Sequence, residues 1–166
     1  YRTLDLYEEL GASVDVTGVY WEMSGCMMDE PGPIAEATVA LLEHLIVEKG
    51  YTCVRYWTLQ NEPNFDMRVL SGEFESYRQI HEFVRTECEE RGLPVLVVGS
   101  DDGQNLPFFE RCVNSEGYYD QCDVFASHRY YPPYAWPMAP YFHDERIDLL
   151  EARQEPAKPF LVTEFG

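Results

Sequence analysis

The sequence predicts an α/β fold built around a parallel sheet. Short runs rich in β-branched and aromatic residues alternate with longer segments whose apolar residues recur every three or four positions. Strands that alternate with helices in this way pair in parallel, because each helix returns the chain to the start of the next strand. The chain has 166 residues, 45% of them hydrophobic, so we expect one domain, 1–166, with a sizeable core.

Five segments are predicted as strands, and helical spacing fills the intervals between them. The predicted strands are 14–21, 53–60, 95–100, 123–131 and 159–166. The predicted helices, by their apolar residues, are 3–10, 34–46, 74–88, 106–113 and 144–153. Gly11 and Gly50 are expected to end the first two helices, and Ser71 to cap the third.

Two architectures fit this order of elements. One is an open doubly wound sheet with helices on both faces, and the other is a (β/α)₈ barrel. No Gly-x-Gly-x-x-Gly fingerprint or Walker loop follows the first predicted strand, so nucleotide-binding versions have no support. In both architectures, ligands meet the C-terminal ends of the strands, and the residues at these ends are the candidates for a site.

Glutamates lie at the ends of two predicted strands. Glu62 follows the second strand in WTLQNEPN, and Glu164 lies near the end of the last in PFLVTEFG. Three helical connections separate these strands. Strands three apart face each other across the mouth of an eight-stranded barrel, whereas in an open sheet they stand in a row. The barrel is therefore the architecture that brings both carboxylates to one ligand.

Two carboxylates across one site suit the cleavage of a glycosidic bond. One donates a proton to the departing oxygen, and the other attacks the sugar carbon or stabilises its positive charge. Asn61 could hydrogen-bond a sugar hydroxyl beside Glu62. Alternation along the fourth strand places His128 and Tyr130 on one face, within reach of the Glu164 tip.

Aromatic residues supply further candidates. Trp21 and Trp136 could stack on the C–H faces of sugar rings. Trp57 lies in the middle of a predicted strand and is expected in the core. Tyr131 competes with Tyr130 for a place in the site.

The motifs LQNEPN and, three β/α units later, LVTEFG resemble those of the clan A glycoside hydrolases. These enzymes are TIM (β/α)₈ barrels with catalytic glutamates at the ends of strands four and seven. The resemblance implies that Glu62 is the general acid/base, that Glu164 is the nucleophile of a retaining mechanism, and that no cofactor is needed. Asn61 matches the asparagine that contacts the sugar 2-hydroxyl. SHRYY, residues 127–131, resembles the segment on the sixth strand of these enzymes whose His and Tyr line the site. This resemblance implies that His128 and Tyr130 bind substrate.

With Glu62 at the end of strand four and Glu164 at the end of strand seven, the chain is an incomplete barrel. It covers about strands 3 to 7 and lacks strands 1, 2 and 8. The first residue is Tyr rather than Met, so a fragment or a processed product is expected. The site residues that the family carries on its missing strands have no counterpart here. Families 5 and 39 of the clan both fit, and a fragment that is inactive through truncation is an alternative.

Other functions remain as alternatives. A carbohydrate-binding barrel without turnover would keep the aromatic residues, and a phosphate- or nucleotide-handling α/β enzyme would need the glycine-rich loop that is missing. Glu62, His128 and Glu164 could ligate a metal, but no His-x-His or His-Glu-x-x-His spacing supports one, so none is expected. Asp101 and Asp102 are expected to form a helix cap and a solvated loop.

Charge, apolar content and cysteines limit the classes of partner and compartment that fit this chain. Lys and Arg number 12 and Asp and Glu 30, a net charge of −18 that repels nucleic acid and anionic membranes but not a neutral oligosaccharide or glycoside. No apolar run is long enough to span a bilayer. Cys112 and Cys122 could form a disulfide in an oxidising compartment. The oligomeric state and the compartment stay open, with secretion slightly favoured.

Overall fold

The computed structural model describes residues 1–19, 31–65 and 74–165, and its centre is an all-parallel sheet of five strands in the order β1-β2-β3-β4-β5. The strands are β1 (Val14–Val19), β2 (Val54–Gln60), β3 (Leu96–Gly103), β4 (Val124–Arg129) and β5 (Phe160–Phe165). Each strand lies beside the one that precedes it in sequence, so the sheet never reverses its winding direction.

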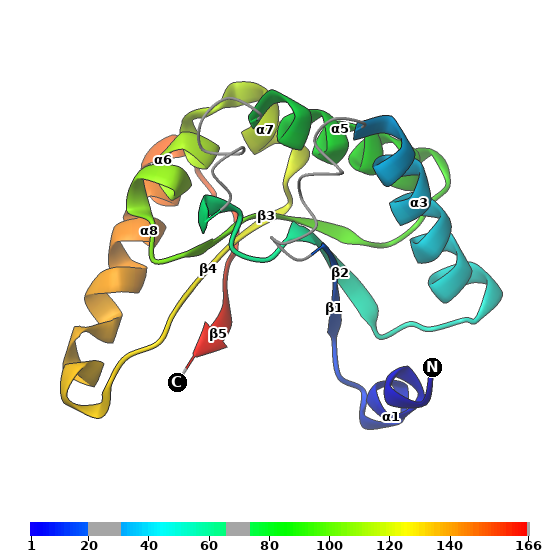
Figure 1. Cartoon of the computed structure of the whole chain (residues 1–166), viewed down its shortest axis with the longest axis horizontal. Coiled ribbons are helices and arrows are strands. Elements are labelled where there is room, and N and C mark those ends of the chain that lie inside the picture. The colour runs from blue at the N-terminus through cyan, green and yellow to red at the C-terminus, as the bar shows by residue number, and fades with distance from the viewer. Residues whose placement is uncertain (20–30, 66–73, 166) are drawn as a thin grey trace.

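The sheet is curled into a half-barrel, and the helices between its strands cover the convex face (Figure 1). The helices are α1 (Arg2–Leu10), α3 (Pro31–Glu43), α5 (Phe74–Glu90), α6 (Leu106–Asn114), α7 (Glu116–Gln121) and α8 (Ala139–Arg153), with a π-helical turn at His44–Glu48 and 3₁₀ turns η3 (Pro63–Phe65) and η4 (Pro133–Met138). Right-handed crossovers that always step to the next strand place their helices on one side. The doubly wound alternative, which needs helices on both faces, is therefore wrong.

The main core lies between the helices and the convex face of the sheet. It includes Trp57 and Leu59 of β2, Val97 of β3 and Phe125 of β4, all 1% exposed or less. The prediction that Trp57 is a core residue is confirmed. The apolar stripe of α5 faces the same core, with Cys88 buried near its end.

A second, smaller apolar cluster covers the concave face. Val98, Val124 and Ala126 form it, and Tyr56 and Leu161 pack against it. These residues alternate along their strands with those of the main core, so they point to the opposite side of the sheet. This concave face, at the C-terminal ends of the strands, is where a ligand is expected.

An extra residue in β3 decides where two consecutive aspartates point. Opposite β4, the pairing moves from Ser100↔Ala126 to Asp102↔Ser127, so Asp101 has no partner of its own. Both aspartates are buried, with 4% of Asp101 and 0% of Asp102 exposed. The expectation of a helix cap and a solvated loop is wrong, because this β-bulge carries both side chains into the protein.

Two further expectations can be compared with the structure, and two lie outside the described residues. The last helix begins at Ala139, five residues before the expected start at 144, because the prolines before it form η4 and lead directly into the helix. Cys112 and Cys122 are buried free thiols without a disulfide. Ser71, the expected helix cap, and Trp21 lie outside the described residues.

A buried ion pair ties α8 to the sheet. Arg146 donates to the Asp102 carboxylate at 2.8 Å and to the Ser127 hydroxyl at 2.8 Å, and its guanidinium lies 3.7 Å from the Phe142 ring centroid. Both charged side chains are 1% exposed or less. Because each charge would be expensive to bury alone, the pair must form together.

We predict that Arg146→Met lowers the free energy of unfolding by about 3 to 5 kcal/mol, because it leaves the Asp102 carboxylate buried without a counter-charge. Urea denaturation at pH 7 measures the loss. Arg78→Met, which removes exposed pairs with Glu75 and Glu82, should cost no more than about 1 kcal/mol. Equal losses in the two variants would contradict this account.

Candidate functional site

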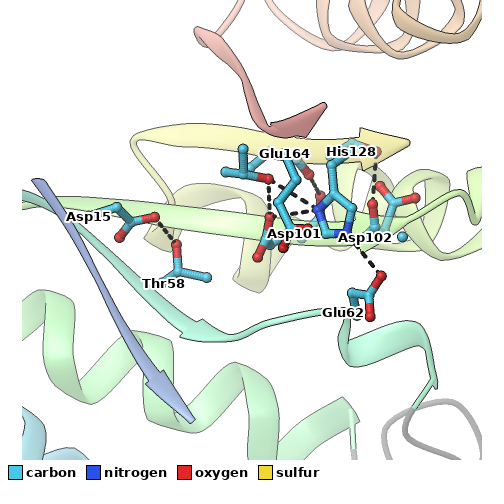
Figure 2. A network of polar contacts seen from close by, with 12 residues as sticks. Asp15, Thr58, Glu62, Asp101, Asp102, His128 and Glu164 are labelled. Atoms are coloured by element: carbon cyan, nitrogen blue, oxygen red, sulfur yellow. Dashed lines mark hydrogen bonds and ion pairs between the residues drawn. The ribbon is translucent and has the colours of Figure 1, made fainter. Parts of the chain in front are cut away.

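The polar residues at the C-terminal ends of β2 to β5 meet around one buried histidine. His128 of β4 is 1% exposed, and its two ring nitrogens contact groups from three other segments. Figure 2 shows Glu62 and Asp101 on two sides of its ring, with Asp15 and Thr58 as a separate pair further along the sheet. The concave side of the sheet thus carries a charged site above its small apolar cluster.

The contacts of His128 differ at its two nitrogens. Nε2 lies 3.0 Å from the Glu62 carboxylate. Nδ1 lies 3.2 Å from the Thr163 hydroxyl and 3.5 Å from the Asp101 carboxylate, and Thr163 donates to Asp101 at 2.6 Å. The imidazole therefore lies between a carboxylate that follows β2 and a hydroxyl–carboxylate pair from β5 and β3.

These neighbours favour the charged imidazolium. Burial opposes the charge, but the hydrogen bonds to Asp101 and Glu62 and the charges of Asp101 and Glu164 outweigh it and raise the pKa of His128 to about 9. His81 shows the opposite case. It is buried in the helix-packed core without a carboxylate partner, and burial lowers its pKa to about 4.

Glu62 is held in an uncommon backbone conformation. Its φ is +50°, and its N–H donates to the Asp101 carbonyl at 3.2 Å. Gly103 of β3 makes room for its side chain, because a Cβ there would lie 2.5 Å from Glu62 Oε1. Asn64 fixes Gly103 in turn, with its amide bonded to the Gly103 N–H at 2.7 Å and carbonyl at 3.0 Å. The first 3₁₀ turn after β2 thus delivers the carboxylate to His128.

Glu164 reaches the same site through an irregularity in β5. Pairing with β4 moves from Ser127↔Val162 to Arg129↔Phe165, which inserts one extra residue in β5. Without it, alternation from Thr163 would turn Glu164 toward the convex face. Instead, Tyr130 donates to Glu164 Oε2 at 2.5 Å, and this hydrogen bond raises the pKa of Tyr130.

The structure therefore brings four of the predicted site residues together. Glu62 contacts His128, and Tyr130 contacts Glu164. The two pairs also influence each other: the charge of Glu164 raises the pKa of His128, and the charge of Glu62 raises the pKa of Tyr130. The expectation that His128 and Tyr130 both reach Glu164 holds for Tyr130, which donates a hydrogen bond to it. His128 instead contacts Glu62, Asp101 and Thr163, and Glu164 acts on it only through its charge.

The other predicted residues lie at the margin of this site or outside the described ranges. Asn61 is half-buried directly before Glu62. Trp136 in η4 is 60% exposed, and its indole N–H donates to the Tyr131 carbonyl at 3.0 Å. Tyr131, the rival of Tyr130, is buried. Trp21 has no described position.

Sequence reasoning missed several polar residues on the concave face. Asp15 of β1 accepts a hydrogen bond of 2.6 Å from Thr58 of β2, and burial raises the pKa of Asp15 to about 6. Asp101 and Thr163 contact His128 directly. One signal was present: aspartate is depleted in strands, so Asp15 within VDVTGV indicates a special environment.

Within residues 1–19, 31–65 and 74–165, the structure shows neither a metal site nor a membrane-spanning helix. No group of three or more His, Cys, Asp or Glu side chains within them has the arrangement to hold a metal ion. Within the same ranges, no helix has both the length and the apolar character needed to cross a bilayer.

No protein family, curated protein or solved structure matches this chain. The function is therefore inferred from the residues of the site and from their geometry.

We predict that the His128 interactions stabilise the fold below pH 6.5 and that this contribution is lost as pH rises through 9. The raised pKa means that the folded state holds its proton more tightly than the unfolded chain does. Urea unfolding of the wild type and His128→Gln at pH 6, 7.5 and 9.5 measures the difference. The advantage of the wild type should shrink by on the order of 2 to 3 kcal/mol over this range. Parallel pH profiles would contradict the assignment.

The ionisation of Asp15 should destabilise the fold, whereas the ionisation of a well-paired carboxylate stabilises it. Its raised pKa means that ionisation opposes folding as pH rises from 3.8 through 6. Asp15→Asn should therefore gain stability relative to the wild type, by about 1 to 3 kcal/mol between pH 4 and pH 7. Thermal unfolding across this range measures the gain, and a constant difference between the two proteins would refute it.

Proposed function

We propose that this chain is part of a (β/α)₈ barrel, about its strands 3 to 7, and that the barrel is a retaining glycoside hydrolase. The observation that carries the proposal is that strand ends separated by three connections place Glu62 against His128 and Glu164 against Tyr130, with the charge of each glutamate acting on the other pair. The curl of the parallel sheet and its sequential strand order support the barrel. The motifs around the two glutamates support the hydrolase.

Glu164 has the surroundings of a nucleophile. The Tyr130 hydroxyl donates to its Oε2, and this hydrogen bond holds the carboxylate in a fixed position. In the first step, a Glu164 oxygen bonds to the anomeric carbon while the glycosidic C–O bond breaks. Water then attacks that carbon, and the glycosyl–Glu164 bond breaks with net retention of configuration.

Glu62 has the surroundings of a group that gives and takes a proton. Its carboxylate shares a hydrogen bond with Nε2 of His128. With the proton on Glu62, the pair is a carboxylic acid and a neutral imidazole, and the acid can donate to the departing oxygen. With the proton gone, Glu62 can take one from the attacking water.

The exposed aromatic residues beyond β4 support a carbohydrate ligand in either of two functions. Tyr134 is 87% and Trp136 60% exposed, in the turn that follows Tyr130. Such faces suit the C–H surface of a sugar ring. A carbohydrate-binding barrel without turnover is therefore the second candidate, and it predicts binding of a glycoside with no release of product.

We predict that the full-length protein hydrolyses aryl glycosides and that Glu164→Gln abolishes turnover. Glu62→Gln should lose about 10²- to 10⁴-fold with a poor leaving group, because protonation then limits departure, but far less with dinitrophenolate, which leaves without a proton. A panel of chromogenic glycosides measures both, and ¹H NMR of the first product gives the stereochemistry.

Glu110→Gln, on the exposed face of α6, is the matched control and should leave rates unchanged. Undiminished hydrolysis by Glu164→Gln, or inversion at the anomeric carbon, would overturn the assignment. Binding without release across the panel would favour the carbohydrate-binding alternative.

A further inference from the structure

Asp101 is a buried carboxylate placed beside His128 by a strained segment of backbone. Ser100 and Asp101 have φ values of +67° and +45°, a backbone region that residues other than glycine rarely occupy. The bulge in β3 turns Asp101 to the concave side, where its carboxylate meets Thr163 and His128. Strain of this kind persists where surrounding contacts enforce it, and it concentrates at functional sites.

Those surrounding contacts come from the convex side of the sheet. The Tyr118 hydroxyl of α7 accepts a hydrogen bond of 2.9 Å from the Ser100 N–H, and the Ser100 hydroxyl bonds the Ala126 carbonyl. Ser100 is fully buried. The core thus fixes the residue before Asp101, and the position of the carboxylate follows from it.

The hydrogen atoms of this network can be assigned by counting donors. Thr163 has a single hydroxyl hydrogen, and it lies on the 2.6 Å bond to Asp101. The Thr163 oxygen must then accept at its 3.2 Å contact with His128, so His128 Nδ1 carries a hydrogen. One further proton remains, shared between His128 Nε2 and Glu62 Oε1.

We propose that Asp101 is a positioning residue which, through Thr163 and His128, retains the shared proton that Glu62 delivers to the departing sugar oxygen. The catalytic part of this inference rests on the proposed function, whereas the effect of Asp101 on His128 does not. The Asp101 charge faces Nδ1 and stabilises the imidazolium, so the pair keeps its proton at higher pH than it otherwise would.

Other charged groups also face the His128–Glu62 pair, and some of them contribute to the pKa of His128. Glu62 and Glu164 act on His128 from the ends of β2 and β5, and Asp15 of β1 is coupled to Asp101 across the concave face. On β4 itself, the Arg129 guanidinium lies over the Tyr131 ring. Asp101 is the buried carboxylate next to Nδ1, so its removal tests the inference most directly.

The first experiment follows the imidazoles directly. In ¹⁵N-labelled protein, the resonances lost in His128→Gln assign His128, and their shifts are followed from pH 5 to 10.5. Asp101→Asn should lower the pKa of His128 by at least about 1 unit. His81, which lies in the helix-packed core and has a pKa of about 4, should stay neutral across this range, with unchanged resonances in both proteins. An unchanged His128 titration would overturn the proposal whether or not the protein is an enzyme.

The second experiment follows the pH dependence of kcat/KM for an aryl glycoside with a poor leaving group. The basic limb should move to lower pH in Asp101→Asn by an amount similar to the NMR shift, because the shared proton is lost earlier. Asp148→Asn, exposed on α8, is the matched control and should leave the profile unchanged. An unmoved basic limb in Asp101→Asn with a lowered His128 pKa would refute the catalytic role.

One further variant keeps the outcomes distinguishable. If Asp101→Asn does not fold, Thr163→Val tests the same network, and it should lower the His128 pKa because the hydroxyl link to Asp101 is lost. An unchanged titration in that variant would contradict the assignment of the Nδ1 hydrogen. If no glycoside is hydrolysed by the wild type, the proposed function fails, while the NMR result still decides whether Asp101 controls the His128 charge.

Discussion

The β-bulge in β3 links the stability of the fold to the chemistry of its site. One extra residue sends Asp101 to the concave face and Asp102 to the convex face. Asp102 binds Arg146 of α8, and Asp101 faces His128. Because the two aspartates are adjacent in the chain, neither can move without displacing the other.

The bulge has an energetic cost that the core offsets. Positive φ angles at Ser100 and Asp101 cost on the order of 1 kcal/mol or more each. Tyr118 bonds the Ser100 backbone, and Arg146 bonds both Asp102 and Ser127. These contacts come from α7 and α8, so the helices that cover the convex face also hold the site on the other side of the sheet.

The electrostatics of the site follow from placing one imidazole among several carboxylates. Asp101 and Glu62 contact His128, and together with the charge of Glu164 they raise its pKa to about 9 against the effect of burial, so it keeps its proton at neutral pH. A site with a local cation and two carboxylates at its edge can handle protons at neutral pH. It does not need a charged substrate, which agrees with a neutral sugar as the proposed ligand.

The sequence by itself determined the class of fold, the order of its elements and the strand ends where the site lies. The alternation of patterns is enough for this, since periodicity and strand-end position are local properties of the chain. Glu62, Glu164, His128 and Tyr130 could be named for the same reason. The sequence also left two windings of the sheet open, and only the structure, with its helices on one face, excluded the doubly wound one.

The tertiary structure alone decided which residues complete the site. Strict alternation turns Asp101 and Glu164 away from the concave face, and the bulges in β3 and β5 reverse both directions. A bulge depends on pairing with a neighbouring strand and on buried contacts such as that of Tyr118 with Ser100. These contacts join residues far apart in the sequence, so no local pattern of residues could reveal them.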